Sequence, residues 1–118
     1  MPRYCLALDL KDDPELIAEY ENKHRSVSPY IKASIKKAGI LNMIIYRTAN
    51  RLFMIMETSE TFSFEAKAAM DAADPLVQEW EALVLNYQQP LSHARNGEKW
   101  VLMDKIFELA EPENREVY

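Results

Sequence analysis

The stretch that decides the fold is Ile40-Leu-Asn-Met-Ile-Ile-Tyr46, followed five residues later by Leu52-Phe-Met-Ile-Met-Glu57. Both runs are rich in residues that favour β-strands, and residues 47–51 between them have the length of a hairpin loop in which Asn50 tolerates a positive φ. The apolar residues are nearly continuous in both runs, which predicts a strand pair that is covered on both faces. A chain of 118 residues has little left to cover a second face, so we expect a partner subunit there.

The segments before this hairpin predict one strand and two helices. Residues 4–10 alternate, with the large apolar side chains on one face, as in a half-buried strand. The Asp-Pro pair at 13–14 supplies an N-cap and a first helical residue for a helix that ends near His24. The Ser-Pro pair at 28–29 starts a second helix, and Gly39 ends it because glycine readily adopts the left-handed conformation after a helix.

The segments after the hairpin predict two more helices and a last strand. Residues 61–72 read as a helix, and the Asp-Pro pair at 74–75 starts another that runs to about Tyr87. A loop follows at 90–97, and residues 100–109 read as the last strand. The order β-α-β-β-α-β predicts an α+β fold of the ferredoxin-like type, with helices on one face of an antiparallel sheet.

Composition and charge describe an ordinary globular chain. With 48% hydrophobic and 28% charged residues, we expect a single domain over residues 1–110 and a polar tail over 111–118. The net charge of −5 argues against nucleic acid or an anionic membrane as a partner, because both attract clustered lysine and arginine. A single cysteine, Cys5, and a strand-like run directly after Met1 favour the cytoplasm.

The candidate acid–base groups are Tyr20 and His24 in the first helix. Their spacing of four residues places the phenol and the imidazole on one helix face. One interpretation makes Tyr20 a core aromatic and His24 a solvated residue in the last turn, where the helix dipole favours it. The other makes them a proton-handling pair, because imidazole groups titrate near neutral pH and a phenol can relay a proton. The spacing by itself favours the first interpretation.

Four further residues are candidates for a small-molecule site. Asp9, Asn42 and Tyr46 are polar residues in strands that otherwise look buried, which suggests a shared polar cavity. Trp80 lies on the apolar face of its helix and fits either the core or a surface on which a sugar ring stacks. Two histidines and one cysteine leave few ligands for a zinc site, so we expect no metal and no cofactor.

Several motifs together resemble the L-rhamnose mutarotase family, and they follow one another through nearly the whole chain. They are Tyr-x-x-x-His at 20–24, the strand at 39–46, the turn and strand at 50–57, Val-Gln-Glu-Trp at 77–80 and the closing segment at 105–109. The resemblance implies a homodimeric α/β barrel in which two ferredoxin-like sheets lie face to face. It also implies cofactor-free interconversion of the α and β anomers of 6-deoxy-L-sugars.

The resemblance further implies roles for single residues. Tyr20 and His24 match the catalytic pair of the family, while Tyr46 and Trp80 match positions that line its sugar pocket. The resemblance thus implies that Tyr20 and His24 move protons and that Tyr46 and Trp80 hold the monosaccharide.

The chain departs from the rhamnose-active members at three places. Met43 stands where they have an aromatic residue, Glu81 stands where they have a second tryptophan, and residues 27–29 read Val-Ser-Pro where they have a Trp-Pro pair. The Asn-Met pair at 42–43 and the Glu-Trp-Glu run at 79–81 look more like the L-fucose branch of the family. We therefore expect L-fucose to be favoured, with L-rhamnose as the alternative substrate.

A protein of another class fits the same order of elements. A dimeric α+β barrel can serve as a small-molecule sensor, a cofactor-free monooxygenase or a haem-degrading domain. The polarity of the pocket discriminates, because a sugar requires several hydrogen-bonding side chains, whereas oxygenation of an aromatic compound favours an apolar cavity.

Overall fold

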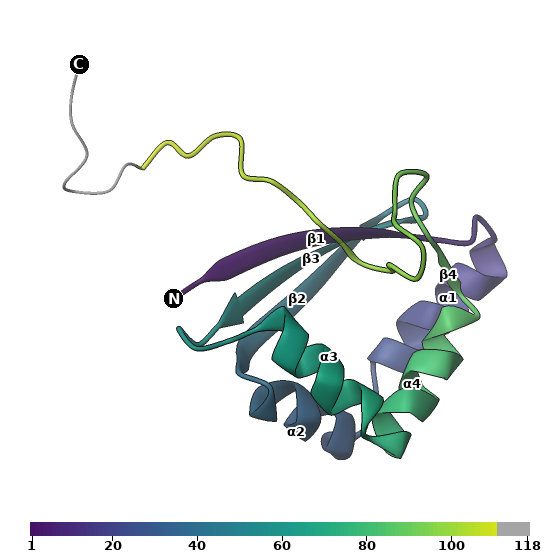
Figure 1. Cartoon of the computed structure of the whole chain (residues 1–118). Coiled ribbons are helices and arrows are strands. Elements are labelled where there is room, and N and C mark those ends of the chain that lie inside the picture. Colours follow the sequence, from purple (N-terminus) through teal and green to yellow (C-terminus); the bar gives the residue numbers. More distant parts are fainter. Residues whose placement is uncertain (111–118) are drawn as a thin grey trace.

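The computed structural model describes residues 1–110, and four helices lie beneath one face of a single sheet in this range (Figure 1). The strands are Arg3–Leu10 (β1), Ile40–Thr48 (β2), Arg51–Thr58 (β3), Gln88–Gln89 (β4) and Val101–Leu102 (β5). The helices are Pro14–His24 (α1), Pro29–Lys37 (α2), Phe64–Ala72 (α3) and Pro75–Leu85 (α4). None of the helices in these 110 residues is long and apolar enough to span a membrane.

The strands form one antiparallel sheet in the order β2-β3-β1-β4, and β5 also pairs with β1. β1 is central, because Leu6 faces Met54 of β3 on one side and Leu102 of β5 on the other. The helices α1 and α2 connect β1 to β2, and α3 and α4 connect β3 to β4. The predicted β-α-β-β-α-β arrangement is confirmed, and each predicted helical layer consists of two helices.

Local sequence signals place most of the helix ends. Asp13, Ser28 and Asp74 each cap a helix with a side-chain oxygen that accepts backbone N–H groups of the first turn, and a proline follows each cap. Gly39 follows α2 with a φ of +101°, the left-handed conformation expected there. These predicted starts and this predicted stop are confirmed.

The start of α3 differs from the prediction of a helix over residues 61–72. A hydrogen bond from the Phe62 N–H to the Ser59 carbonyl closes a turn in this segment. Ser63 then takes the N-cap position, with its hydroxyl accepting from the Ala66 N–H, and the helix begins at Phe64. The first residues of the predicted helix therefore lie in this turn and at the N-cap, and they are not helical.

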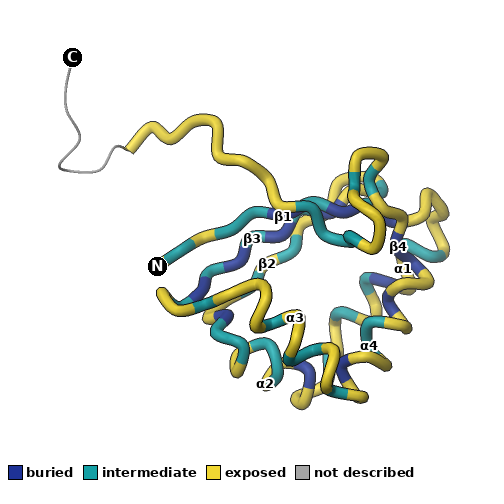
Figure 2. Tube along the Cα trace, in the orientation of Figure 1, coloured by how far each residue is buried: buried dark blue, intermediate teal, exposed yellow. Residues whose placement is uncertain are grey.

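The core lies between the sheet and the helices, where buried segments face one another in Figure 2. Alternation along β1 directs Leu6, Leu8 and Leu10 toward the helices, as predicted. Leu8 and Leu10 are fully buried, and Ile40 of β2 and Leu52 of β3 are nearly so. These close-packed side chains hold the helices against the sheet. They therefore also fix the positions of the side chains between the two layers.

The hairpin turn is tighter than the predicted five-residue loop. β2 continues to Thr48 and β3 begins at Arg51, so the turn has two residues. The positive φ, +48°, belongs to Ala49 and not to Asn50. Asn50 instead binds the end of β1. Its side-chain amide donates to the backbone carbonyl of Leu10 at 3.0 Å, and its backbone carbonyl accepts from the Leu10 N–H at 2.7 Å.

The second face of the sheet is left uncovered by residues 1–110. Ile44 pairs with Ile55 and Tyr46 pairs with Phe53, so these four side chains share the face opposite the helices. Ile44 is 40% exposed and Tyr46 is 56% exposed. The sequence predicts that both faces are covered. Within residues 1–110 only the face that carries the four helices is covered, and the face with Ile44 and Tyr46 is not. We call the uncovered side the open face.

The predicted last strand, residues 100–109, is wrong over most of its length. Only Val101–Leu102 pairs with β1, extended by a hydrogen bond from the Met103 N–H to the Cys5 carbonyl. Continuing this antiparallel register would bring Ile106 opposite Pro2, which precedes β1. Ile106 and the residues after it therefore have no strand residue of β1 to pair with. Ile106 is accordingly 95% exposed. The predicted polar tail at 111–118 lies outside the described residues.

Candidate active site

A cavity of about 710 Å³ lies between the helix-facing side of the sheet and the helices. Its volume falls within the range of about 300–1,000 Å³ that is usual for ligand sites. The floor is apolar and consists of side chains from the three long strands: Leu6, Met43, Ile45, Met54 and Met56. The walls come from all four helices and the chain around β4, and they carry most of the polar groups.

Three aromatic side chains stack along one wall of this cavity. α1 places Tyr20 and His24 one turn apart on the same face, and their ring centroids are 4.3 Å apart at an interplanar angle of 35°. Trp80 of α4 meets the other side of the imidazole, edge to face, with centroids 5.3 Å apart. All three line the cavity, so the imidazole is held between a phenol and an indole.

The orientation of His24 fixes the state of its ring nitrogens. Nδ1 lies 2.9 Å from the backbone carbonyl oxygen of Tyr20. A carbonyl oxygen can only accept, so Nδ1 carries a hydrogen and donates it. In the neutral imidazole Nε2 is then the unprotonated nitrogen, with a lone pair that can accept a proton. His24 is half-buried in the cavity wall, in contrast to the solvated helix-end interpretation.

Tyr20 is held in the neutral form by its surroundings. Its side chain is 4% exposed and belongs to the core cluster around Leu10, so the core interpretation of this residue is also correct. The pKa of Tyr20 is raised to about 12: burial raises it most, a hydrogen bond from Gln88 acts in the opposite direction, and the negative charge of Glu81 adds to the rise. The hydroxyl therefore remains an O–H donor at neutral pH.

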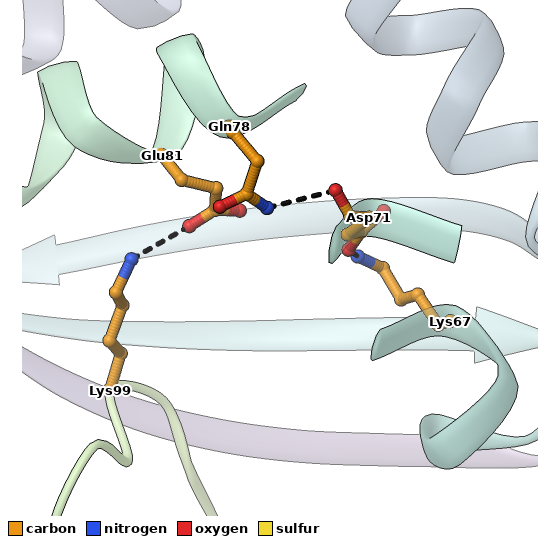
Figure 3. A network of polar contacts seen from close by, with 5 residues as sticks. All are labelled: Lys67, Asp71, Gln78, Glu81 and Lys99. Atoms are coloured by element: carbon orange, nitrogen blue, oxygen red, sulfur yellow. Dashed lines mark hydrogen bonds and ion pairs between the residues drawn. The ribbon is translucent and has the colours of Figure 1, made fainter. Parts of the chain in front are cut away.

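A charged network borders the cavity along α3, α4 and the loop before β5 (Figure 3). Lys67 and Asp71 form an ion pair within α3, and the Gln78 side chain donates to the Asp71 carbonyl at 2.8 Å. Lys99 reaches across from the loop to Glu81 of α4, with 2.9 Å between Nζ and Oε2. The i,i+4 spacing of Lys67 and Asp71 predicts their ion pair from the sequence. Lys99 and Glu81 are 18 residues apart, and only the fold brings them together.

Gln88 is a pocket residue that the sequence patterns did not single out. It is the first residue of β4, it is buried, and it lines the cavity close to Tyr20. A glutamine that follows an apolar helix carries no signal of its own, because its role depends on a strand only two residues long.

The remaining predicted site residues are not gathered into this cavity together. Asn42 lies at the cavity mouth, next to a bulge in the pairing of β2 with β3. Asp9 and Tyr46 lie on the open face, because each is paired with an open-face residue of β3. Asp9 forms a salt bridge with Arg51 at 2.8 Å. The shared polar cavity expected for all three residues is thus not the arrangement found, because Asn42 lines the cavity and Asp9 and Tyr46 do not.

No group of three or more histidine, cysteine, aspartate or glutamate side chains within residues 1–110 is arranged to hold a metal ion. The polar groups that line the cavity include a neutral phenol, an imidazole, two amides, a serine hydroxyl and several charged side chains, some of them in ion pairs. This set suits proton transfer and hydrogen bonding to an uncharged polar ligand.

Fold and site together define a ferredoxin-like α+β protein with a pocket between its sheet and its helices that is lined by a phenol and an imidazole. Residues 3–109 match the family model described as L-rhamnose mutarotase. The chain therefore belongs to the L-rhamnose mutarotase family, as its motifs predicted. Mutarotases are isomerases, so the chain is an enzyme of that class.

A curated relative agrees with this assignment, and two solved structures share the fold. The chain is 46% identical over 113 residues to an L-fucose mutarotase of Xanthomonas campestris pv. campestris, and the match covers 94% of this chain and 90% of that protein. An L-rhamnose mutarotase from Formosa agariphila has a similar fold, with a TM-score of 0.68, 16% identity and coverage of 93% of this chain and 100% of that chain. A dimeric ferredoxin-like protein from an uncultured marine organism superposes with a TM-score of 0.52 at 13% identity, covering 92% and 98% of the two chains.

Proposed function

We propose that this protein interconverts the α and β anomers of a 6-deoxy-L-sugar without a cofactor, and that L-fucose is favoured over L-rhamnose. The observation that carries the proposal is His24, whose Nδ1 donates to the Tyr20 carbonyl, which leaves the lone pair on Nε2, and whose ring lies against the rings of Tyr20 and Trp80. The 46% identity to an L-fucose mutarotase supports the choice of sugar.

Mutarotation requires a base at the anomeric hydroxyl and an acid at the ring oxygen. His24 Nε2 takes the proton of the anomeric hydroxyl, the bond from C1 to the ring oxygen breaks, and the ring oxygen takes a proton from the Tyr20 hydroxyl. The C1–C2 bond of the open aldehyde rotates, and the ring-closing hydroxyl then attacks the opposite face of the aldehyde carbon. The imidazolium returns its proton to the new anomeric oxygen, and Tyr20 recovers its own from the hydroxyl that closes the ring.

The cavity suits a sugar that has a methyl group in place of one hydroxyl. Trp80 offers an apolar surface on which a sugar ring can stack, and the methionine floor offers an apolar surface for the methyl group. The polar wall faces this floor and includes Gln88 and Glu81. A purely apolar cavity, as the monooxygenase alternative requires, would lack that wall.

The preference for L-fucose rests on two positions that line the pocket. Met43 lies on the floor where rhamnose-active members have an aromatic residue, and Glu81 lies on the wall where they have a second tryptophan. Because Lys99 holds Glu81 at 2.9 Å, the wall at this point is polar and fixed. L-Fucose and L-rhamnose differ in hydroxyl stereochemistry, so a wall that pairs those hydroxyls discriminates between them.

We further propose a homodimer in which two open faces stack into a barrel. The support is the exposure of Ile44 and Tyr46 on that face, together with the exposed apolar segment at Ile106 and Phe107. In such a dimer Asp9 and Tyr46 would lie at the subunit interface. A single cysteine among 118 residues suits a reducing compartment, and we assign the enzyme to the cytoplasm.

Polarimetry of freshly dissolved α-L-fucose tests the activity. The optical rotation should reach its equilibrium value faster in proportion to enzyme concentration, and a heat-denatured sample should restore the spontaneous rate. An optical rotation that drifts at the spontaneous rate at every enzyme concentration would reject the proposed function.

A further inference from the structure

Gln88 carries a buried hydrogen-bond acceptor that has no protein partner. The side chain is 6% exposed, and its Oε1 has no hydrogen bond within residues 1–110. Buried polar atoms are nearly always paired, so an orphaned acceptor in a cavity wall indicates a group that arrives from outside the chain. Gln88 lines the cavity, which gives such a group a route to it.

The other end of the same amide is already occupied. The Gln88 side chain forms a hydrogen bond with the Tyr20 hydroxyl of the kind that stabilises the phenolate, so the amide N–H donates and the phenol oxygen accepts. The hydrogen of the phenol is then left for a different acceptor. One glutamine that lines the cavity therefore contacts Tyr20 with its nitrogen and has its oxygen unpartnered within residues 1–110.

The backbone around Gln88 is fixed by the sheet. Gln88 pairs with Leu10, which is fully buried in the core, and the adjacent Gln89 pairs with Asp9. Because successive strand residues point to opposite faces, Gln88 turns inward while Gln89 is exposed. The amide is thus a preorganised group held on the sheet rather than on a mobile loop.

We propose that Gln88 binds the substrate directly, with Oε1 accepting a hydrogen bond from a sugar hydroxyl while the amide nitrogen holds the Tyr20 hydroxyl in place. This inference rests on the proposed mutarotase function and adds a substrate-binding residue to it. Gln88 links the bound sugar to the acid, so its loss weakens sugar binding and also disturbs the alignment of Tyr20.

The test compares Gln88→Met with Gln89→Met, which make the same chemical change on opposite sides of one strand. Methionine keeps the length of the side chain but cannot accept or donate as an amide does. We expect Gln88→Met to raise the KM for L-fucose about tenfold and to lower kcat by a smaller factor, as for one lost neutral hydrogen bond. Gln89→Met should leave both constants unchanged.

A second measurement on the wild-type protein does not depend on turnover or on a variant that folds. In a nitrogen–proton NMR spectrum, L-fucose should shift the side-chain amide resonances of Gln88 in a saturable manner and leave those of Gln89 in place. Exchange of L-fucose anomers without this shift, and with an unchanged KM in Gln88→Met, would overturn the inference alone. A wild-type protein that neither binds nor exchanges L-fucose would overturn the proposed function, and the inference with it.

Discussion

Replacing His24 by asparagine removes the group that we assign as the base while keeping a polar side chain at the helix end. General acid–base catalysis by one positioned group contributes about 10²–10⁴-fold. We therefore expect kcat/KM for L-fucose to fall at least about 100-fold, which corresponds to about 2.7 kcal/mol in the activation barrier at 1.36 kcal/mol per factor of ten.

The same substitution should cost the fold little. The hydrogen bond from His24 Nδ1 to the Tyr20 carbonyl, 2.9 Å long, contributes about 1 kcal/mol, and an asparagine N–H can donate to the same carbonyl. The lost ring contacts with Tyr20 and Trp80 contribute about 0.5–1.5 kcal/mol. An unfolding free energy lower by about 1–2 kcal/mol moves the thermal midpoint by only several degrees.

The assay is the rate of optical rotation change, measured together with the thermal midpoint. His93→Asn is the matched control, because the second histidine of the chain is exposed in the loop after β4. His93→Asn should behave as wild type in both measurements. A His24→Asn protein that exchanges anomers at the wild-type rate would refute the assignment of His24 as the base.

Three further predictions concern the acid, the open face and the hairpin. Burial raises the pKa of Tyr20 from 10.0 to about 12, so the folded protein keeps a proton that the unfolded chain loses in this range, and unfolding free energy falls as pH rises from 10 toward 12. Tyr20→Phe should flatten this fall in denaturant titrations, and an identical slope would contradict the burial argument. Ile55→Asp places a charge on the open face and should give a monomer in sedimentation, whereas Leu76→Asp on α4 should remain a dimer; a wild-type monomer would contradict the proposed assembly. Asn50→Ala removes the amide that binds the Leu10 carbonyl and should lower the unfolding free energy by about 1 kcal/mol, and an unchanged denaturation midpoint would show that this bond contributes nothing.

The sequence predicts the parts of the fold that depend on local signals. Asp13, Ser28 and Asp74 are caps followed by proline, and such signals act within one turn of the chain. The alternation of β1 also predicts which of its faces is buried, because that pattern reflects the sheet directly. Tyr20 and His24 are brought together by helical spacing alone.

The features that the sequence does not predict depend on distant partners. The strand expected over residues 100–109 pairs with β1 only at Val101–Leu102, and beyond Lys105 the register leaves no residue of β1 to pair with. Tyr46 and Asn42 are polar residues four apart in one strand, and alternation places both on one face, yet Asn42, beside a bulge in the pairing, lines the cavity and Tyr46 does not. Gln88 acquires its place in the pocket only when β4 pairs with β1.

Exchange between the anomers of equilibrated L-fucose and L-rhamnose, measured by NMR saturation transfer, tests the central claim most directly. Both sugars are compared at equal concentration, with the same enzyme sample and with a chelator present. We predict exchange above the spontaneous rate that the chelator does not change, and faster exchange for L-fucose than for L-rhamnose. Faster exchange of L-rhamnose would contradict the assigned substrate preference, and exchange of neither sugar above the spontaneous rate would contradict the mutarotase function itself.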